Sequence, residues 1–358
     1  MKRQLLGVAA FMLALSAHAQ DNPLWMRYCA ISPDGTSIAF TYKGDIYTVP
    51  VNGGKAAQIT TNAAHDTHPV WSPDGKQIAF ASDRMGSMDI FVVDREGGIP
   101  KRLTTHSGNE TPVAFKDADH ILFLANVMPS AEDAQFPSGQ FQQVYEVSTT
   151  GDRPVMFSSM PMEDISINKT GNALLYHDKK GYEDPWRKHH TSSITRDIWL
   201  CSLDGKRSYR KLTSFNGEDR TPVWASDGKS FYYLSEEKGS FNVFKRALDG
   251  TSSTQLTHHT KHPVRFLTAA DNGTLCYGYD GEIYTMKEGT EPRKVQISIL
   301  TDKNDKDLIR QIRRNGATEI ALSPDAKEVA FILRGDVYVT SVAVSYTHLR
   351  AHETTLHL

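Results

Sequence analysis

Residues 69–80 read PVWSPDGKQIAF, and residues 32–40 carry nearly the same phrase, SPDGTSIAF. The Pro-Asp-Gly step is turn chemistry, since proline presets φ and glycine tolerates the positive φ of a tight turn. An apolar strand follows, and then a segment of the type Asp-Ile-aromatic, at 45–47 and 89–91. Several short strands in a unit of roughly 40 residues are typical of a β-propeller, whose blades bury their faces against one another.

Six copies of the unit run in order along the chain. The later ones are recognised by TPVAF at 111–115, DISI at 164–167, TPVWASDGK at 221–229 and PVRF at 263–266. We therefore predict an all-β fold, in which residues 20–300 form a six-bladed β-propeller of four-stranded antiparallel blades. The phrase restarts as EIALSPD at 319–325, which predicts one additional, orphan partial blade.

The segment 301–317 is highly charged and interrupts the repeat. Two interpretations remain open, a solvated linker or a short helix over 305–314 with Leu308, Ile309 and Ile312 on one face. The repeat then resumes over 318–343, either as a seventh blade or as the first strands of a second, truncated propeller. The charged interruption favours the second propeller.

The first 19 residues have the pattern of a signal peptide. Lys2 and Arg3 are followed by an apolar run at 5–15 and by Ala-His-Ala at 17–19. The apolar run is too short to cross ~30 Å of hydrocarbon, and no cysteine follows the cleavage site directly. We therefore expect an exported product without a membrane span, located in a bacterial periplasm.

The other end of the chain, residues 344–358, does not continue the blade pattern. Residues 344–354 read VSYTHLRAHET, which resembles the translated sequence of a common transposase-based sequencing adapter. The alternative is a genuine strand or helical tail. We interpret 344–358 as a non-native tail and expect the natural chain to continue differently after Ala343.

Composition narrows the function classes. The net charge is −2 and no basic stripe stands out, so nucleic acid is not an expected partner. The three cysteines, Cys29, Cys201 and Cys276, lie in three different blades, and an odd number at such separations argues against a disulfide framework. There is no G-x-S-x-G elbow and no phosphate-binding glycine motif, so we predict no catalytic residue and no cofactor.

Two blades carry insertions, at 127–143 and 179–196, and long loops on a rigid scaffold often carry function. The second insertion combines basic and aromatic side chains suited to the carboxylate end of a peptide, by charge pairing and stacking. The predicted substrate-binding residues are Trp186, Arg187, Lys188, His189 and Arg196. The alternative is that this loop packs against a neighbouring blade or a missing domain.

Two histidine clusters precede strands. The first cluster holds His65 and His68, with Asp66 between them. A third metal ligand is not evident, so we interpret that loop as solvent-exposed. A second cluster at 258–262 holds His258, His259 and His262, and weak metal or ligand contact there is the less favoured alternative. We predict no metal site.

The repeats resemble the WD40-like Pro-Asp propeller repeat of the TolB type, and residues 21–342 as a whole resemble the N-terminal part of the tricorn protease family. Three features carry this resemblance. They are the signal peptide followed by NPLWMRY at 22–28, the six copies followed by a charged break, and the fourth-blade insertion that ends in TRDIW at 195–199. The resemblance implies a large modular serine peptidase, in which a six-bladed propeller precedes a seven-bladed one, a PDZ domain and a peptidase core.

In that family the propellers are thought to channel or sieve peptides, and the proteins tend to form oligomers. The Ser, His and Glu that do the chemistry lie in the C-terminal core, so no catalytic residue carries over to this chain. The resemblance implies a propeller fragment that gates or binds peptides, with its own missing peptidase and PDZ domains as partners and a homo-oligomer as the assembly.

Other function classes remain as alternatives. A non-catalytic TolB-like periplasmic protein-binding propeller is the first, although that class usually has a small domain before the propeller. An enzyme with its site on the propeller is the second. A lyase would need convergent His or carboxylate groups at the axis, and a prolyl-oligopeptidase relative would need an α/β-hydrolase domain.

Overall fold

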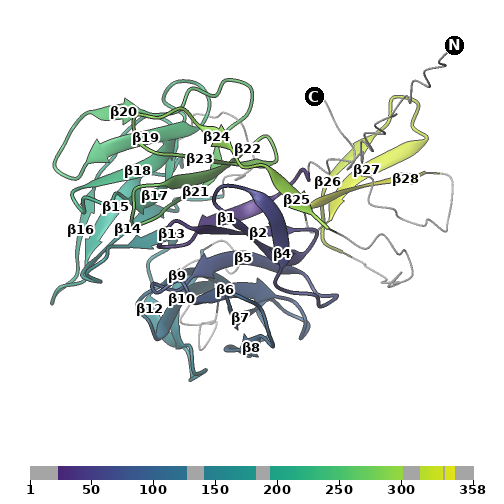
Figure 1. Cartoon of the computed structure of the whole chain (residues 1–358), viewed down its shortest axis with the longest axis horizontal. Coiled ribbons are helices and arrows are strands. Elements are labelled where there is room, and N and C mark those ends of the chain that lie inside the picture. The colour runs from purple at the N-terminus through teal and green to yellow at the C-terminus, as the bar shows by residue number, and fades with distance from the viewer. Residues whose placement is uncertain (1–22, 127–140, 183–193, 301–314, 334, 343–358) are drawn as a thin grey trace, which may run out of the picture.

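The computed structural model describes residues 23–126, 141–182, 194–300, 315–333 and 335–342, and these residues form strands and turns without a helix (Figure 1). The predicted signal peptide, the charged segment 301–314 and the residues 344–358 lie outside the described residues. Six sheets have at least four strands each, and a seventh has three. The predicted all-β propeller with one partial blade is confirmed.

The first three blades follow one another along the chain, each with its strands in sequence order. Blade 1 contains β1 Arg27–Ile31, β2 Ser37–Tyr42, β3 Asp45–Pro50 and β4 Gly54–Gln58; blade 2 contains β5 Asp66–Trp71, β6 Gln77–Ser82, β7 Asp89–Asp94 and β8 Lys101–Arg102; blade 3 contains β9 Thr111–Phe115, β10 His120–Ala125, β11 Gln143–Ser148 and β12 Val155–Ser158.

The next three blades repeat this plan. Blade 4 contains β13 Met162–Ile167, β14 Ala173–Asp178, β15 Ile198–Ser202 and β16 Ser208–Lys211; blade 5 contains β17 Asp219–Trp224, β18 Ser230–Ser235, β19 Asn242–Ala247 and β20 Ser253–Gln255; blade 6 contains β21 Arg265–Ala269, β22 Leu275–Tyr279, β23 Glu282–Met286 and β24 Arg293–Lys294.

The blades close into a ring. The first strand of each blade contacts the first strand of the next, in the order β1, β5, β9, β13, β17, β21 and back to β1. After blade 6, β25 Ile297–Ile299 returns to blade 1 and pairs in parallel with its outer strand β4, with Ile297 opposite Gly54. Sequence-distant blades 1 and 6 are therefore neighbours.

The repeated phrase builds the turn between the first two strands of a blade. In blade 2, Ser72 Oγ donates to Asp74 Oδ1 at 2.7 Å, and it accepts from the Gln77 amide at 2.9 Å. Gly75 has a φ of 67°, which glycine adopts without steric cost. The hydrophobic core lies between adjacent blades, where Phe80 is fully buried and stacks on Phe91 with centroids 5.9 Å apart.

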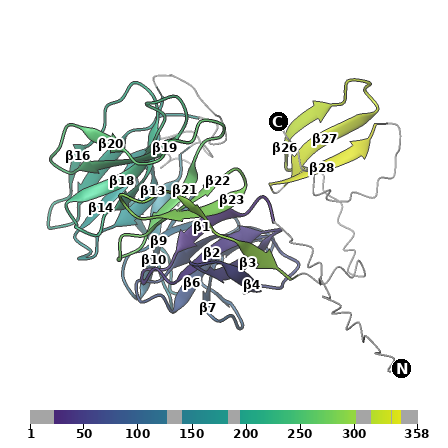
Figure 2. The same ribbon diagram turned by 45° about the horizontal axis from the view of Figure 1, so that its top comes forward.

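The three-stranded sheet, which we call the outlying sheet, contains β26 Ala317–Leu322, β27 Glu328–Leu333 and β28 Asp336–Ser341. It lies outside the ring of six blades in both views (Figures 1 and 2), and it meets blade 1 where Arg27 lies against Gly335. Its first strand leaves Ile320 and Leu322 exposed at 71% and 64%. No neighbouring blade among the described residues covers that strand.

Candidate functional site at the propeller axis

Each innermost strand carries a bulge or register shift at the same place, facing the axis of the ring. In five of the six blades the first bulged residue adopts a left-handed conformation, which is strained for a residue other than glycine. These residues are Tyr28, His68, Asp164, Thr221 and Phe266, with φ of 51°, 55°, 49°, 51° and 56°. In blade 3 the unpaired residue is Val113, and the residue four places before the turn is Pro112, which pairs with Phe123 and whose ring holds φ negative. We call Pro112 and the five left-handed residues the axial ring.

Aromatic side chains form one arc of the axial ring, contributed by blades 6, 1 and 2. The Tyr28 ring lies 3.7 Å from the His68 ring and 4.8 Å from the Phe266 ring, measured between centroids. All three side chains are half-buried. The arc therefore presents a continuous aromatic surface assembled from three different blades.

The opposite arc is polar and comes from blades 4 and 5. Thr221 Oγ1 donates to Asp164 Oδ2 at 2.6 Å, and His177 Nδ1 lies 3.5 Å from the same oxygen. The Asp164 side chain remains 46% exposed. Its charge raises the pKa of both Tyr28 and His68, so the polar arc acts electrostatically on the aromatic arc.

Burial sets the charge state of the aromatic arc. It lowers the pKa of His68 to about 4, with the Asp164 charge working partly against the shift, so the imidazole is neutral at pH 7. Burial also raises the pKa of Tyr28. The axial ring thus combines neutral aromatic faces with one accessible carboxylate. Such a set can stack on apolar or planar groups and accept hydrogen bonds from an ammonium or peptide N–H.

A second electrostatic feature repeats at three seams between blades. There a carboxylate at the head of one blade's third strand lies near a carboxylate that precedes or opens the next blade's first strand. The pairs are Asp45 with Asp66, Asp89 with Glu110, and Asp197 with Asp219. One acid of each pair forms an ion pair with a basic side chain. These ion pairs are Arg84–Asp66 at 2.9 Å, Arg102–Asp89 at 2.8 Å and Lys180–Asp197 at 2.5 Å.

The other acid of each pair holds its proton up to about pH 7. Burial raises the pKa of Asp45, Glu110 and Asp219 to about 7 in each case. Glu110 is 1% exposed and accepts a hydrogen bond from Thr104 Oγ1, while its Oε1 finds no hydrogen-bond partner among the described residues. These seams are part of the scaffold and make its stability sensitive to pH.

Of the site residues predicted from sequence, only Arg196 is described; Trp186, Arg187, Lys188 and His189 lie outside the described residues. Arg196 is 5% exposed, and its Nη1 donates to Glu218 Oε1 at 2.7 Å. Its Nε lies 3.5 Å from Glu163 Oε2. Arg196 therefore connects blade 4 to blade 5 at the end of the insertion.

Glu163 anchors this charged cluster beside the axial ring. Burial alone would raise the pKa of Glu163, yet the hydrogen bond from His177 and the nearby cations hold it well below its usual range. His177 Nε2 lies 3.2 Å and Lys179 Nζ 2.7 Å from the Glu163 carboxylate. The Glu163 carboxylate is therefore ionised at neutral pH, and His177 lies between it and the neighbouring Asp164.

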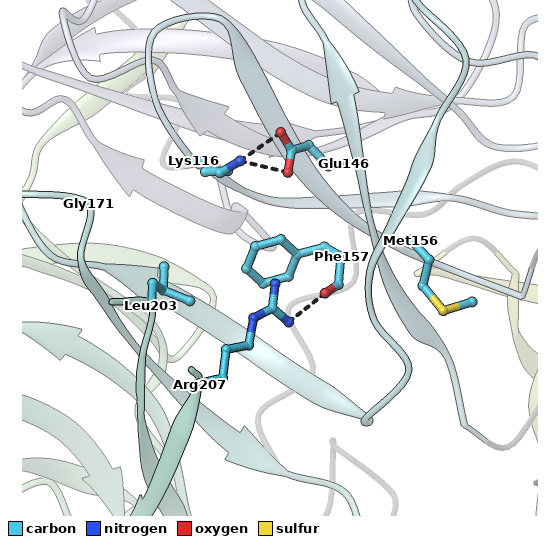
Figure 3. Close-up of a pocket in the computed structure, with 7 residues that line it drawn as sticks. All are labelled: Lys116, Glu146, Met156, Phe157, Gly171, Leu203 and Arg207. Atoms are coloured by element: carbon cyan, nitrogen blue, oxygen red, sulfur yellow. Dashed lines mark hydrogen bonds and ion pairs between the residues drawn. The ribbon is translucent and has the colours of Figure 1, made fainter. Parts of the chain in front are cut away.

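A surface pocket of about 350 Å³ lies where blade 3 meets blade 4 (Figure 3). Its charged groups are directed at partners within the pocket. Lys116 Nζ is 2.8 Å from both carboxylate oxygens of Glu146, and Arg207 Nη1 donates to the Phe157 carbonyl at 2.5 Å. The Arg207 guanidinium also covers the Phe157 ring at 4.1 Å. We interpret this pocket as a seam between blades rather than as a ligand site.

The structure corrects the interpretation of the loop before blade 2 as solvent-exposed. Asp66 is fully buried and is the first residue of β5, and His68 belongs to the axial ring. The usable signal was positional, because the axial residue stands four places before the Ser or Ala of the turn phrase, as in His68 before Ser72 and Thr221 before Ala225. This position can be recognised as part of a site only in the closed ring, because ring closure brings these residues of different blades together.

The other histidine cluster makes local contacts. His259 Nε2 is 3.0 Å from the Tyr277 hydroxyl, and its ring stacks on Tyr279 with centroids 3.8 Å apart. His262 Nε2 is 3.2 Å from Asp280 Oδ1. Within the described part of the chain, no three His, Cys, Asp or Glu side chains are arranged to hold a metal ion. No helix in that part is long and apolar enough to cross a membrane.

Comparison with known proteins was made at the level of family, sequence and structure. Residues 23–292 match the family of tricorn protease N-terminal beta propeller domains. The chain is 25% identical over 279 residues to tricorn protease homolog 1 of Streptomyces coelicolor, which covers 77% of this chain and 25% of that protein. It is 25% identical over 336 residues to the tricorn protease of Thermoplasma acidophilum, covering 90% of this chain and 30% of that protein.

Solved structures agree on the fold. The crystal structure of the tricorn protease superimposes with a TM-score of 0.67 at 20% identity, covering 91% of this chain and 31% of that one. TolB from Acinetobacter baumannii superimposes with a TM-score of 0.54 at 15% identity, covering 73% of this chain and 60% of that one. The chain thus spans between 25% and 30% of the length of the two curated relatives named above.

Proposed function

The chain belongs to the family of tricorn protease N-terminal β-propeller domains, and from this premise we propose that it is the peptide-binding propeller of an exported tricorn-like serine peptidase. Because the chain spans only 25–30% of those relatives' length, the proposal assigns catalysis to a C-terminal core outside it. The partners are the peptide substrate, the protein's own PDZ and peptidase domains, and further copies of the same protein.

The axial ring is the observation that carries the proposal. Five blades contribute strained residues that place three aromatic rings opposite the half-exposed carboxylate of Asp164. Strain of this kind persists where the surrounding structure enforces it and is concentrated at functional sites. Peptide side chains would stack on the aromatic arc, and Asp164 would accept the α-ammonium group or a Lys or Arg side chain.

Substitution of Asp164 tests this directly. We expect Asp164→Asn to weaken binding of fluorescent peptides with a free N-terminus about tenfold, as for loss of a charge-assisted hydrogen bond. Fluorescence anisotropy measures the affinity, with N-acetylated peptides run in parallel. Asp249→Asn is the matched control, since Asp249 is 99% exposed on an outer turn of blade 5. Equal affinities for Asp164→Asn and Asp249→Asn would contradict binding at the axis.

The basic insertion of blade 4 is proposed as a second contact, for the peptide carboxylate. Arg187→Ala together with Lys188→Ala should weaken the binding of peptides with a free C-terminus and leave the binding of C-terminally amidated peptides unchanged. Arg196 is unsuitable for this test, because its removal would leave Glu218 buried without that ion pair. An equal loss of affinity for both types of peptide would contradict the proposal that the insertion binds the C-terminal carboxylate.

The identity of the parent protein is tested on the gene. Under the proposal the reading frame continues after residue 343 into PDZ and peptidase domains, and the complete protein hydrolyses peptides while residues 20–343 alone do not. A stop codon at that point would overturn the peptidase assignment. The TolB-like protein-binding propeller would then be the function to examine.

A further inference from the structure

The seam that closes the ring brings two cysteines together. Along this seam β1 of blade 1 lies against β21 of blade 6. Cys29 Sγ on β1 donates to the Phe266 carbonyl at 3.5 Å, and the Ile31 amide donates to Thr268 Oγ1 at 3.1 Å. Cys29 is therefore placed beside the bulge of β21.

Cys276 reaches the same spot from the next strand. It lies on β22, where its Cα is paired with that of Thr268. The Cys29 thiol and the Thr268 hydroxyl both act on the pKa of its thiol, and Cys29 and Cys276 are free thiols in the structure. Cys29 and Cys276 are 2% and 0% exposed and share one hydrophobic cluster, which also holds Phe40 of blade 1 and Ile283 of blade 6.

We propose that Cys29 and Cys276 are a disulfide site that locks blade 1 to blade 6 when the protein folds in an oxidising compartment. The Sγ–Sγ bond forms as the two thiols lose their protons and two electrons. A disulfide-bearing oxidant accepts the two electrons and the two protons: a thiol–disulfide oxidoreductase becomes a dithiol, and oxidised glutathione becomes two molecules of reduced glutathione.

The position explains what the bond would do. The seam is otherwise held by non-covalent contacts, such as the short parallel pairing of β25 with β4 and the Met26 amide on the Gly281 carbonyl at 3.1 Å. A bond from the first inner strand to the last blade encloses nearly the whole ring, and in the chain-entropy model longer loops gain more from such a cross-link. Cys201 lies in blade 4, so it is left as a buried free thiol.

The folded seam protects the pair. Burial raises the pKa of the Cys276 thiol, and thiols in apolar surroundings react slowly. Oxidation must therefore occur while the last blade docks on the first. Once the seam is folded, an oxidant or a reductant reaches the pair only when the seam opens, as it does on heating. The inference does not depend on peptide binding.

Counting thiols tests the proposal on the full chain. The protein is purified from an oxidising bacterial periplasm and from a reducing cytosol, then denatured without reductant and alkylated with a maleimide. We expect one labelled cysteine in the periplasmic protein and three in the cytosolic protein, from the three in the sequence. Trypsin should release residues 28–43 joined to residues 266–287. Refolding of the cytosolic protein in a glutathione redox buffer gives the same readout independently.

Variants separate the pair from the third cysteine. Cys201→Ser should keep the linked peptide and leave no labelled cysteine in the oxidised protein. Cys276→Ala should lose the linked peptide together with the several-degree fall in melting temperature that reductant causes in the oxidised wild type. Three labelled cysteines after both oxidative treatments, or a bond to Cys201, would overturn the proposal.

Discussion

Blade 2 and the outlying sheet are built from the same phrase, yet only blade 2 is buried. Their turns match, because Ser323 Oγ donates to Asp325 Oδ1 at 2.6 Å as Ser72 does to Asp74 at 2.7 Å. Their aromatic pairs also match, with centroid distances of 5.6 Å for Phe331–Tyr338 and 5.9 Å for Phe80–Phe91. Local sequence is therefore sufficient to form the turn and the three-stranded pairing.

The difference lies in what the neighbours supply. Trp71 of β5 is 7% exposed, whereas Leu322 at the equivalent place of β26 is 64% exposed. His68 is left-handed, but no residue of β26 has a positive φ. Packing into the ring thus provides both the burial and the strain that distinguish a blade from a free sheet of the same sequence type.

The largest expected effect comes from removing the equivalent aromatic ring in each region. Phe80→Ala should reduce the free energy of unfolding of the propeller by about 3–5 kcal/mol, because it empties a fully buried site. Phe331→Ala should change it by less than about 1 kcal/mol, since that ring is only half-buried in the outlying sheet. Urea unfolding followed by tryptophan fluorescence measures both. Equal losses would mean that the outlying sheet is as tightly packed as a blade.

A smaller effect is expected on the pH dependence of stability. Blade 3 has the buried acid Glu110 just before its first strand, whereas the outlying sheet has Ala317 at the equivalent place and no group there to titrate. In the unfolded chain this acid ionises near 4.5, but in the folded propeller it keeps its proton up to about pH 7. The stability that the proton provides is complete below pH 4.5 and is lost as the pH rises through 7. Glu110→Gln should flatten this decline by about 3 kcal/mol.

Unfolding free energies measured between pH 4 and pH 8 check this, with Glu319→Gln on the outlying sheet as the control. The amide that Glu110→Gln introduces can keep the contact with Thr104 and offer an N–H to the nearby Asp89 carboxylate. Parallel profiles for wild type and Glu110→Gln would refute the raised pKa.

The smallest effect concerns the turn itself. Gly75 has a φ of 67° and Ala326, at the same place of the outlying sheet, has 54°. Gly75→Ala should destabilise the propeller by about 1 kcal/mol through backbone strain alone, because an added Cβ would meet Pro33 Cδ at an ordinary 3.7 Å. Ala326→Gly should relieve the same strain and slow amide exchange in β26–β28 about fivefold. Faster exchange in Ala326→Gly would show that the turn is not what limits the sheet.

The blades of this protein could be predicted from its amino-acid sequence alone. The turn phrase, the apolar strands and the count of six are local properties, because each rests on residues a few positions apart. The site was not accessible in the same way. The insertion could be recognised in the sequence by its basic and aromatic residues. The axial ring consists of unlike residues whose only common property is their position.

Closure of the ring determines which blades are neighbours, and with that the functional chemistry. Tyr28 meets Phe266, and Cys29 meets Cys276, only because blade 6 returns to blade 1. The three cysteines are free in the structure, in keeping with their odd number and wide separation. Separation along a chain nevertheless does not measure distance around a closed ring, so Cys29 and Cys276 still share one hydrophobic cluster. Contacts that form at ring closure join residues with no local relation to each other, so no repeat, motif or spacing could have revealed them.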